Sequence, residues 1–373
     1  MNQVIIIGGG ILGASAAYQL AKSGYAVTVI DRGEPGQATG AAAGIICPWL
    51  SQRRNKAWYA LAKGGAAFYP ELIRSLEQDG ETETGYRRVG AVSVHTDPAV
   101  LDLAEERAVT RRVGAPEIGE IRRLSEEETR EIVPMLGEEF ASVRISGAAR
   151  VNGGQLRKAM LSAAQKHGAA IVHGSAVVSA ADGKVNGAMV DGELIRADAV
   201  LVTAGAWAAE AVAPIGLKLD VHAQKAQILH LRLENEPTDD WPVIMPPRRH
   251  YIVPADNGKI IVGTTHEDEH EFEMFPTAGA IHEMLDKAFV TAPLLKKAVF
   301  EEVNVGYRPF TADNLPVAGR LGGIDGLYFA NGLGSSGLTV GPYLGVQLAK
   351  MATGETLDID PALYSPDKAI ARE

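Results

Sequence analysis

Three closely spaced glycines near the start of the chain form the first pattern that could do chemistry. Gly8, Gly10 and Gly13 fit the spacing G-x-G-x-x-G. They follow an unbroken apolar run at 4–7, as expected for a strand buried on both faces of a parallel sheet. The first glycine would permit a tight turn, the second would let a pyrophosphate approach the backbone, and the third would let a helix pack on the strand. A helix expected at 11–22 would point its free N–H groups at that pyrophosphate.

An acidic residue completes this pattern. A second strand, expected at 26–30, ends in Asp31, which lies 18 residues beyond Gly13 and is placed to hydrogen-bond a ribose hydroxyl. Glycines after a strand also occur in ordinary turns, but the strand, the helix and the acid together favour a dinucleotide site. A carboxylate here favours an unphosphorylated ribose, so we expect FAD or NAD rather than NADP.

The composition limits the class of protein. A chain of 373 residues suggests two domains, and 46% hydrophobic with 22% charged residues is typical of a soluble globular protein. The net charge of −10 without a basic tract makes nucleic acid and anionic membranes poor partners. No apolar segment reaches the roughly 20 residues of a membrane span, and the N-terminus lacks the charged region of a signal peptide. The one cysteine, Cys47, excludes an internal disulfide, so we expect a cytoplasmic protein.

Other stretches indicate how the chain is organised. The loop at 32–44 is rich in Gly and Ala, which would let a cofactor lie against the backbone, and a strand at 90–94 is expected at the edge of a second sheet. A hairpin is expected about the Asn-Gly pair at 257–258. Further strand–glycine–helix junctions are expected at 198–207 and 327–338, and we expect all such junctions to converge on one extended ligand.

A run of histidines and acids at 266–271 raises the possibility of a metal site. Its members, His266, Glu267, Asp268, Glu269, His270 and Glu271, are adjacent in sequence and lack the spacing of metal ligands. A solvated loop is therefore the favoured interpretation, and we expect no metal.

Five segments of the chain resemble the FAD-dependent amino-acid and amine oxidoreductases typified by glycine oxidase, D-amino-acid oxidase and sarcosine oxidase. These segments are 8–13, 39–44, 203–207, 306–316 and 332–337. They run through nearly the whole chain in the expected order, and glycine oxidase is the member that it resembles most.

The resemblance implies an α/β fold, with a Rossmann-like FAD-binding domain and a discontinuous α+β substrate domain built on an antiparallel sheet. Segments 1–50, 145–215 and 305–373 would form the FAD-binding domain. Segments 51–144 and 216–304 would form the substrate domain.

The resemblance also implies the site residues. Arg308 would pair with a substrate carboxylate, to which a planar guanidinium is suited, and Tyr251 would add a hydroxyl contact. From the sequence alone, an ordinary surface or ion-pair arginine would be the favoured interpretation of Arg308. The residues expected to contact FAD are Gly8, Gly10, Ile11, Leu12, Gly13, Asp31, Arg32, Thr39, Gly40, Ala43, Gly44, Ile45, Val177, Gly205, Gly332, Leu333, Gly334, Ser335, Ser336, Gly337 and Leu338.

Three departures from the family matter. Most relatives place Glu where this chain has Asp31, which keeps the ribose contact with a shorter arm. Glycine oxidase carries His, Phe, Arg and Asn where this chain has residues 333–336, so its second arginine is missing here and glycine becomes a doubtful substrate. Sarcosine oxidases attach FAD through a cysteine late in the chain, and because none exists here we expect noncovalent FAD.

The expected reaction is oxidative deamination of glycine, a D-amino acid or a small N-substituted amino acid, by hydride transfer from Cα to the flavin N5. The resulting imine would hydrolyse to a 2-oxo acid. Electrons would pass to oxygen or to a respiratory acceptor, and relatives suggest a homo-oligomer. The alternatives are oxidation of a secondary amine such as sarcosine or proline, oxidation of a 2-hydroxy acid, and a non-catalytic FAD-binding protein.

Overall fold

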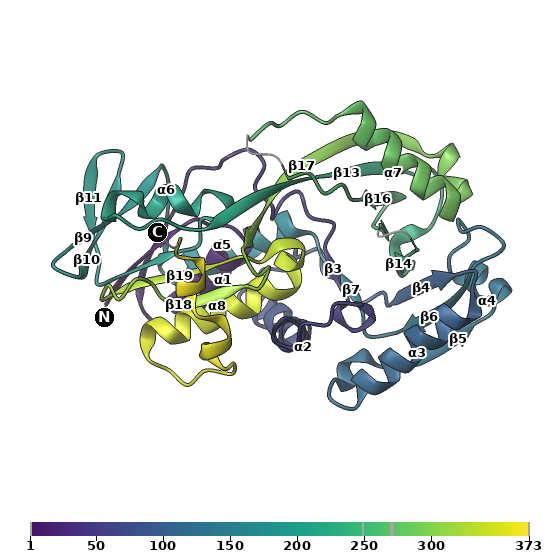
Figure 1. Ribbon diagram of the computed structural model, residues 1–373, viewed down its shortest axis with the longest axis horizontal. Coiled ribbons are helices and arrows are strands. Elements are labelled where there is room, and N and C mark those ends of the chain that lie inside the picture. Colours follow the sequence, from purple (N-terminus) through teal and green to yellow (C-terminus); the bar gives the residue numbers. More distant parts are fainter. Residues whose placement is uncertain (1, 248–249, 269–271, 372–373) are drawn as a thin grey trace.

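The computed structural model describes residues 2–247, 250–268 and 272–371, and two large sheets dominate it (Figure 1). Within these residues, the first sheet has six strands, all parallel except its edge strand β18, which runs antiparallel to β19. In spatial order they are β18 (Val317–Arg320), β19 (Leu327–Asn331), β12 (Ala199–Val202), β1 (Gln3–Ile7), β2 (Ala26–Asp31) and β8 (Ala170–His173). This sheet, with helices on its face, confirms the expected α/β class.

The second large sheet has eight strands, and its neighbours are antiparallel except for one parallel pair, β14 and β4. In spatial order they are β17 (Val299–Thr311), β13 (Val221–Arg232), β16 (Lys259–Gly263), β15 (Tyr251–Pro254), β14 (Val243–Met245), β4 (Ala91–His95), β6 (Ala141–Ile145) and β5 (Ile121–Leu124). The hairpin expected about Asn257-Gly258 is present between β15 and β16. In Figure 1, β13 and β17 form a long ribbon that reaches from one sheet region to the other.

The edge position expected for the strand near residue 90 is wrong. This strand, β4, lies inside the eight-stranded sheet, between β14 and β6. Both flanking strands are short and come from distant parts of the chain, so the local sequence around β4 carries no sign of them.

Smaller sheets and eight α-helices complete the described part of the chain. Strands β9 (Ala176–Ala181), β10 (Lys184–Val190) and β11 (Glu193–Arg196) form an antiparallel sheet, and β3 (Ile45–Ile46) pairs with β7 (Ala149–Arg150). The helices are α1 (Ile11–Lys22), α2 (Lys56–Gln78), α3 (Pro98–Arg112), α4 (Glu126–Ile132), α5 (Gly153–Lys166), α6 (Ala208–Val212), α7 (Ala278–Thr291) and α8 (Gly337–Thr353). Among the described residues, no helix combines the length and the hydrophobicity needed to span a bilayer.

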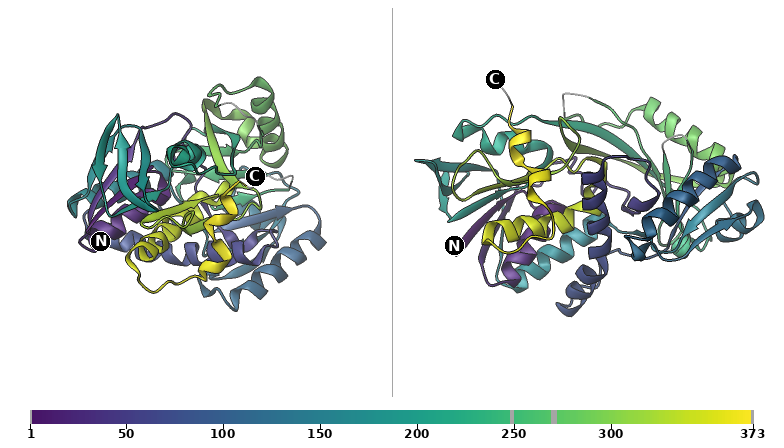
Figure 2. Two further views of the ribbon diagram at one scale, coloured as in Figure 1. Left: turned by 60° about the vertical axis from the view of Figure 1, so that its left-hand side comes forward. Right: turned by 60° about the horizontal axis from the view of Figure 1, so that its bottom comes forward.

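The parallel sheet is buried on both faces, which explains the unbroken apolar run in β1. Val4 and Ile6 pack in one core cluster with α1, α2, α5 and α8. Ile5 and Ile7 point the other way, into a second cluster with α6 and the sheet β9–β11. Figure 2 shows these layers from two further sides. Burial on both faces makes the carboxyl edge of this sheet a rigid support for the loops that leave it.

The eight-stranded sheet carries a separate core. Ile252, Ile260 and Val262 lie on the face that packs against α7, where Met284 and Ala288 are buried. This alternation along β15 and β16 is typical of a sheet with one face turned to a core. It leaves the opposite face of the sheet available to form the wall of a site.

Candidate functional site

A large cavity of about 770 Å³ opens at the carboxyl ends of the parallel strands. The turns after β1, β2, β12 and β19 all contribute to its wall, as the rule for ligand sites in open α/β sheets predicts. Residues of the eight-stranded sheet close its far end, among them Tyr251, Thr264 and Arg308. The expected convergence of the strand–glycine–helix junctions is therefore observed, and the volume lies within the range of ligand cavities, roughly 300–1,000 Å³.

Two glycines of the turn between β1 and α1 have no room for a side chain. Gly8 has φ +98°, and a Cβ added there would lie 2.7 Å from the Cα of Ala204. A Cβ at Gly13 would lie 2.0 Å from the carbonyl oxygen of Gly8, so the third glycine allows the helix to pack on the turn. Arg157 of α5 fixes the turn from the side, because its Nε donates to the carbonyl of Gly9 at 2.5 Å.

The start of α1 suits an anion. Its first turn contains no acidic residue, and Gly10 provides no side-chain cap. The N–H of Ile11 donates to Thr39 Oγ1 at 3.0 Å, while Leu12 lies on the cavity wall. First-turn N–H groups have no acceptor within their own helix, and the helix dipole places partial positive charge at this end. These features fit the pyrophosphate of a dinucleotide.

Asp31 holds the neighbouring loop and retains capacity for one more donor. Its Oδ2 accepts the N–H of Gly9 at 2.6 Å, and its Oδ1 accepts the N–H of Gly33 at 2.7 Å and Nε2 of Gln37 at 2.9 Å. A carboxylate offers about four acceptor sites. With three used, the group fits a single ribose hydroxyl.

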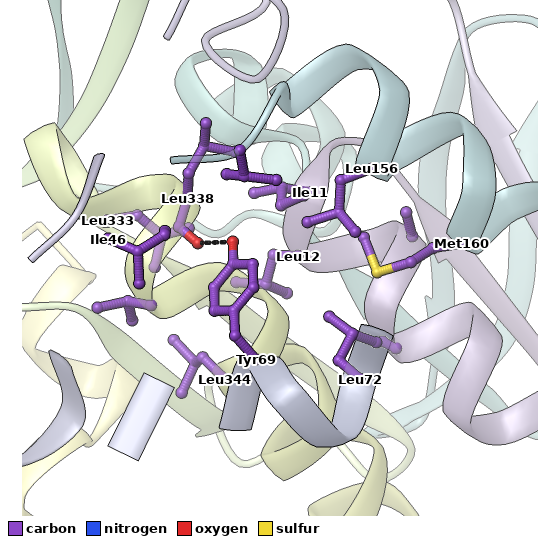
Figure 3. Close-up of a cluster of buried hydrophobic side chains, with 14 of the residues drawn as sticks. Ile11, Leu12, Ile46, Tyr69, Leu72, Leu156, Met160, Leu333, Leu338 and Leu344 are labelled. Carbon is purple, nitrogen blue, oxygen red and sulfur yellow. Dashed lines mark hydrogen bonds between the residues drawn. The ribbon is translucent and has the colours of Figure 1, made fainter. Parts of the chain in front are cut away.

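The junction between β19 and α8 is held by the long helix α2. The Nε1 of Trp58 donates to Ser336 Oγ at 2.9 Å, and the hydroxyl of Tyr69 donates to the carbonyl of Leu338 at 2.5 Å. Figure 3 shows Tyr69 reaching Leu338 within an apolar cluster that also contains Ile11 and Leu12. The first turns of α1 and α8 are thus packed into one unit.

Most of the residues expected to contact FAD line this cavity. They are Gly8, Gly10, Ile11, Leu12, Asp31, Arg32, Thr39, Ala43, Gly44, Ile45, Val177, Gly205, Leu333, Gly334, Ser335, Ser336, Gly337 and Leu338. Gly13, Gly40 and Gly332 are not part of its wall. Gly13 serves packing, Gly332 turns the chain with φ +74°, and Gly40 is exposed with no atom near its missing Cβ.

Arg308 is positioned by the eight-stranded sheet. Arg308 lies within β17, which continues to Thr311, and it pairs with Gln224 of β13. Its Nη2 donates to Thr264 Oγ1 at 3.1 Å. Its Nη1 is buried and has no hydrogen-bond partner in the described part of the chain. A guanidinium nitrogen left without an acceptor in a cavity wall calls for an anionic ligand.

Tyr251 stands next to this guanidinium. Burial raises the pKa of Tyr251, although Arg308 and Thr264 oppose the shift. Burial lowers the pKa of Arg308, and Tyr251 opposes that shift. Opposite Tyr251 on β16, a Cβ at Gly263 would lie 2.5 Å from the phenol ring, so the glycine makes room for the ring. The phenol therefore remains a neutral hydroxyl that can donate to a ligand held by Arg308.

Several lining residues were not expected from the sequence. Met245, His250 and Thr264 belong to no motif, and the pairing of distant strands brings them to the wall. Gln37 lies in the loop at 32–44, and His266 begins the run at 266–271. An aromatic group borders the same cavity, with Phe272 5.0 Å from Trp207 and 4.7 Å from Tyr307, measured between ring centres. No sequence spacing relates these three rings.

The run at 266–271 falls partly outside the structure. Glu269, His270 and Glu271 lie outside the described residues, while Glu267 is tied to Gln227 and Thr265 by hydrogen bonds. In the described part of the chain, no group of three or more His, Cys, Asp or Glu residues could hold a metal ion. Cys47 also lines the cavity, and burial raises the pKa of its thiol to about 12.

Comparisons with known proteins agree with this geometry. The profile of a family described as FAD dependent oxidoreductase (DAO) matches residues 3–351. The chain is 54% identical to the uncharacterized oxidoreductase YurR of Bacillus subtilis (strain 168) over all of both chains. It is 30% identical to a glycine oxidase of Pseudomonas aeruginosa (strain PAO1), covering 98% of each. The crystal structure of an iminodiacetate oxidase from Chelativorans sp. BNC1 superposes with a TM-score of 0.94 and 42% identity, covering 97% of this chain and 98% of that one.

Proposed function

Because this chain belongs to the FAD-dependent oxidoreductase (DAO) family, we propose that it oxidises a small amino acid whose amine carries a second substituent, as in iminodiacetate. FAD is the cofactor of the family, and bound FAD supplies the two-electron acceptor for a Cα–H bond. We also propose the division into an FAD-binding domain (1–50, 145–215 and 305–373) and a substrate domain (51–144 and 216–304).

The observation that carries this proposal is the partnerless Nη1 of Arg308 in the cavity wall. Arg308 binds the substrate carboxylate through Nη1, while Nη2 stays on Thr264 and keeps the guanidinium plane fixed. Tyr251 donates its hydroxyl to the same carboxylate. Two donors that hold one carboxylate restrict the orientation of the neighbouring Cα, and such positioning can supply a large part of a rate enhancement.

The loop after β19 lacks the arginine that the resemblance to glycine oxidase implies there. Leu333, Gly334, Ser335 and Ser336 stand there, and Ser336 already accepts the indole N–H of Trp58. Met245, His250 and His266 also line this cavity. The missing arginine weakens the case for glycine and so supports a substrate whose amine carries a second substituent.

Likeness to the iminodiacetate oxidase supports an N-carboxymethyl amine as substrate, because that enzyme is 42% identical over 97% of this chain. A primary amino acid such as glycine or a D-amino acid is the second candidate. The 30% identity to a glycine oxidase over 98% of both chains supports it.

Anaerobic mixing of the holoenzyme with iminodiacetate, sarcosine, glycine, D-alanine, D-proline and lactate tests the proposal. Bleaching of the flavin absorbance reports reduction directly, and with sarcosine the product identifies the oxidised carbon, because oxidation at Cα gives glyoxylate and oxidation at the N-methyl group gives formaldehyde. We expect the fastest bleaching with iminodiacetate. Faster bleaching with glycine or D-alanine would select the second candidate, and bleaching by lactate alone would overturn both. Repeating the mixing in air and with an artificial dye distinguishes oxygen from another electron acceptor.

A further inference from the structure

A second cavity, of about 510 Å³, lies between the start of α2 and the later turns of α3. Its wall carries six cationic side chains, which are Arg53, Arg54, Lys56, Lys63, Arg107 and Arg111, and we call it the basic hollow. No Asp or Glu lines it. The chain as a whole has a net charge of −10, so this local cluster of six cations contrasts with the rest of the molecule.

The six cations lack an ion-pair partner in the described part of the chain. Within the described ranges 2–247, 250–268 and 272–371, none of them forms an ion pair. Three of them donate to backbone carbonyls instead: Arg53 to Asn314, Lys63 to Gly114 at 3.1 Å, and Arg111 to Trp49 at 2.6 Å and to Ser51 at 2.7 Å. Carbonyl oxygens hold these side chains in place but carry no net charge that would neutralise them. Burial lowers the pKa of Arg53, and the nearby carboxylate of Asp313 opposes that shift without forming an ion pair.

The like charges oppose one another. Burial lowers the pKa of Arg111, and the neighbouring Arg107 lowers it further, while Tyr59 acts in the opposite direction. The guanidinium of Arg111 lies 4.5 Å from the centre of the Tyr59 ring, which orients it across the hollow. The start of α2 adds to the positive potential, because Lys56 is its first residue and its first turn contains no acid. An anion in the hollow would relieve this repulsion.

The shape of the site favours a small molecule. A flat basic face suits a membrane or an acidic protein, whereas this hollow has a volume within the range of ligand cavities, roughly 300–1,000 Å³. We propose that the basic hollow binds a small polyanion, a polyphosphate or a polycarboxylate that carries at least two negative charges. Three separate stretches of sequence supply its cations, which is why no basic tract is visible along the chain.

The basic hollow shares a segment with the large cavity. Ser51 and Trp58 line the large cavity, while residues 52–56 between them line the basic hollow. The guanidinium of Arg53 lies 4.9 Å from the centre of the Trp58 ring. The two cavities therefore lie on either side of one segment of the chain. We expect a ligand in the basic hollow to alter the fluorescence of flavin bound in the large cavity.

Titration calorimetry of the holoenzyme with tripolyphosphate and, separately, with citrate tests the proposal at low ionic strength. The test variant is Lys56→Gln/Arg107→Gln, which leaves Arg111 and its carbonyl contacts intact. The control is Arg112→Gln, since Arg112 is exposed on the same helix but is not part of the hollow. We expect at least one of the two anions to bind, with a Kd that rises about tenfold or more in the double variant and stays unchanged in the control. Raising the salt concentration should weaken binding.

Each outcome decides the question. Binding of tripolyphosphate alone or of citrate alone identifies the polyanion class. Absence of heat with both anions, or equal weakening in the double variant and the control, overturns the proposal. Binding only to vesicles that contain anionic lipid, or only to an acidic protein, overturns it as well, because the small-molecule claim would then be wrong. None of these readouts depends on which amine the enzyme oxidises.

Discussion

Thr264 Oγ1 accepts a hydrogen bond from Nη2 of Arg308 at 3.1 Å, and this contact leaves the other terminal nitrogen, Nη1, buried and free of any partner in the described residues. Thr264 is itself buried, and its hydroxyl donates to the carbonyl of Gln227 at 3.0 Å. The guanidinium is therefore anchored on one side and open on the other. This asymmetry sets the direction from which a carboxylate can approach.

Replacing Arg308 should separate substrate binding from cofactor binding. We expect Arg308→Ala to retain yellow flavin but to raise KM by an amount equivalent to about 2–5 kcal/mol, because the substrate carboxylate loses its buried cationic partner. Steady-state kinetics on the purified holoenzyme measures this. Arg308→Lys should recover only part of the loss, since a point charge cannot form two parallel bonds. Unchanged kinetics in Arg308→Ala would remove this residue from the site.

The hydroxyl of Tyr251 should matter at every ordinary pH. Because burial raises the pKa of Tyr251 above its usual value of 10.0, the phenol stays protonated and able to donate throughout the neutral range. We expect Tyr251→Phe to weaken binding by about 1.5 kcal/mol or more, roughly tenfold in KM. The difference between variant and wild type should be constant from pH 6 to pH 9, within the range where the phenol is neutral. A difference that disappears within that range would show that the phenol ionises there.

Two glycines of one loop should respond differently to the same change. Gly44 has φ +82°, and an added Cβ would lie 1.8 Å from the carbonyl oxygen of Val151. We expect Gly44→Ala to cost about 1–3 kcal/mol of unfolding free energy and to lower FAD retention. Gly40→Ala is the matched control, because no atom lies within 4 Å of its added Cβ. Denaturant unfolding and the ratio of flavin to protein absorbance measure both effects, and equal behaviour of the two variants would contradict the prediction.

The single thiol should be inert in the folded protein. Burial raises the pKa of Cys47 to about 12, from an ordinary value of 9.0, so almost no thiolate forms at pH 8. A chromogenic thiol reagent should find no reactive group in the native holoenzyme and one per chain after unfolding in urea. The raised pKa also determines how this thiol affects the free energy of unfolding. The thiol favours the folded state below about pH 9, and that contribution declines as the pH rises toward 12. Rapid labelling of the native protein would contradict this assignment.

The flavin should leave the protein on denaturation. The chain contains one cysteine, Cys47, and its un-ionised thiol is a poor nucleophile for attachment to a flavin. We expect acid precipitation to release all of the yellow colour into the supernatant. A yellow pellet after washing would show a covalent bond and contradict the prediction.

The sequence predicted those parts of the site whose residues lie close together along the chain. The apolar run of β1, the glycines after it and Asp31 lie within one βαβ unit, so their relative positions follow from spacing alone. The Asn-Gly turn predicted the β15–β16 hairpin for the same reason, since both of its residues have positive φ.

What the sequence could not show depends on pairing between distant strands. Thr264 reaches Arg308 only because β13 lies between β16 and β17, a register that no local pattern encodes. The interior position of β4 was missed because its neighbours come from residues more than 40 positions away. The six cations of the basic hollow likewise meet only after α2 and α3 have packed.

The burial of Cys47 also bears on how the enzyme tolerates its own reaction. Thiols are oxidised to sulfenic acid mainly as exposed thiolates, and this one is neither exposed nor ionised. If oxygen is the electron acceptor, hydrogen peroxide released beside the flavin meets a protonated sulfur that reacts slowly. Oxidative ageing of this protein should then begin at its partly exposed methionines, Met189, Met245, Met274 and Met351, rather than at its only cysteine.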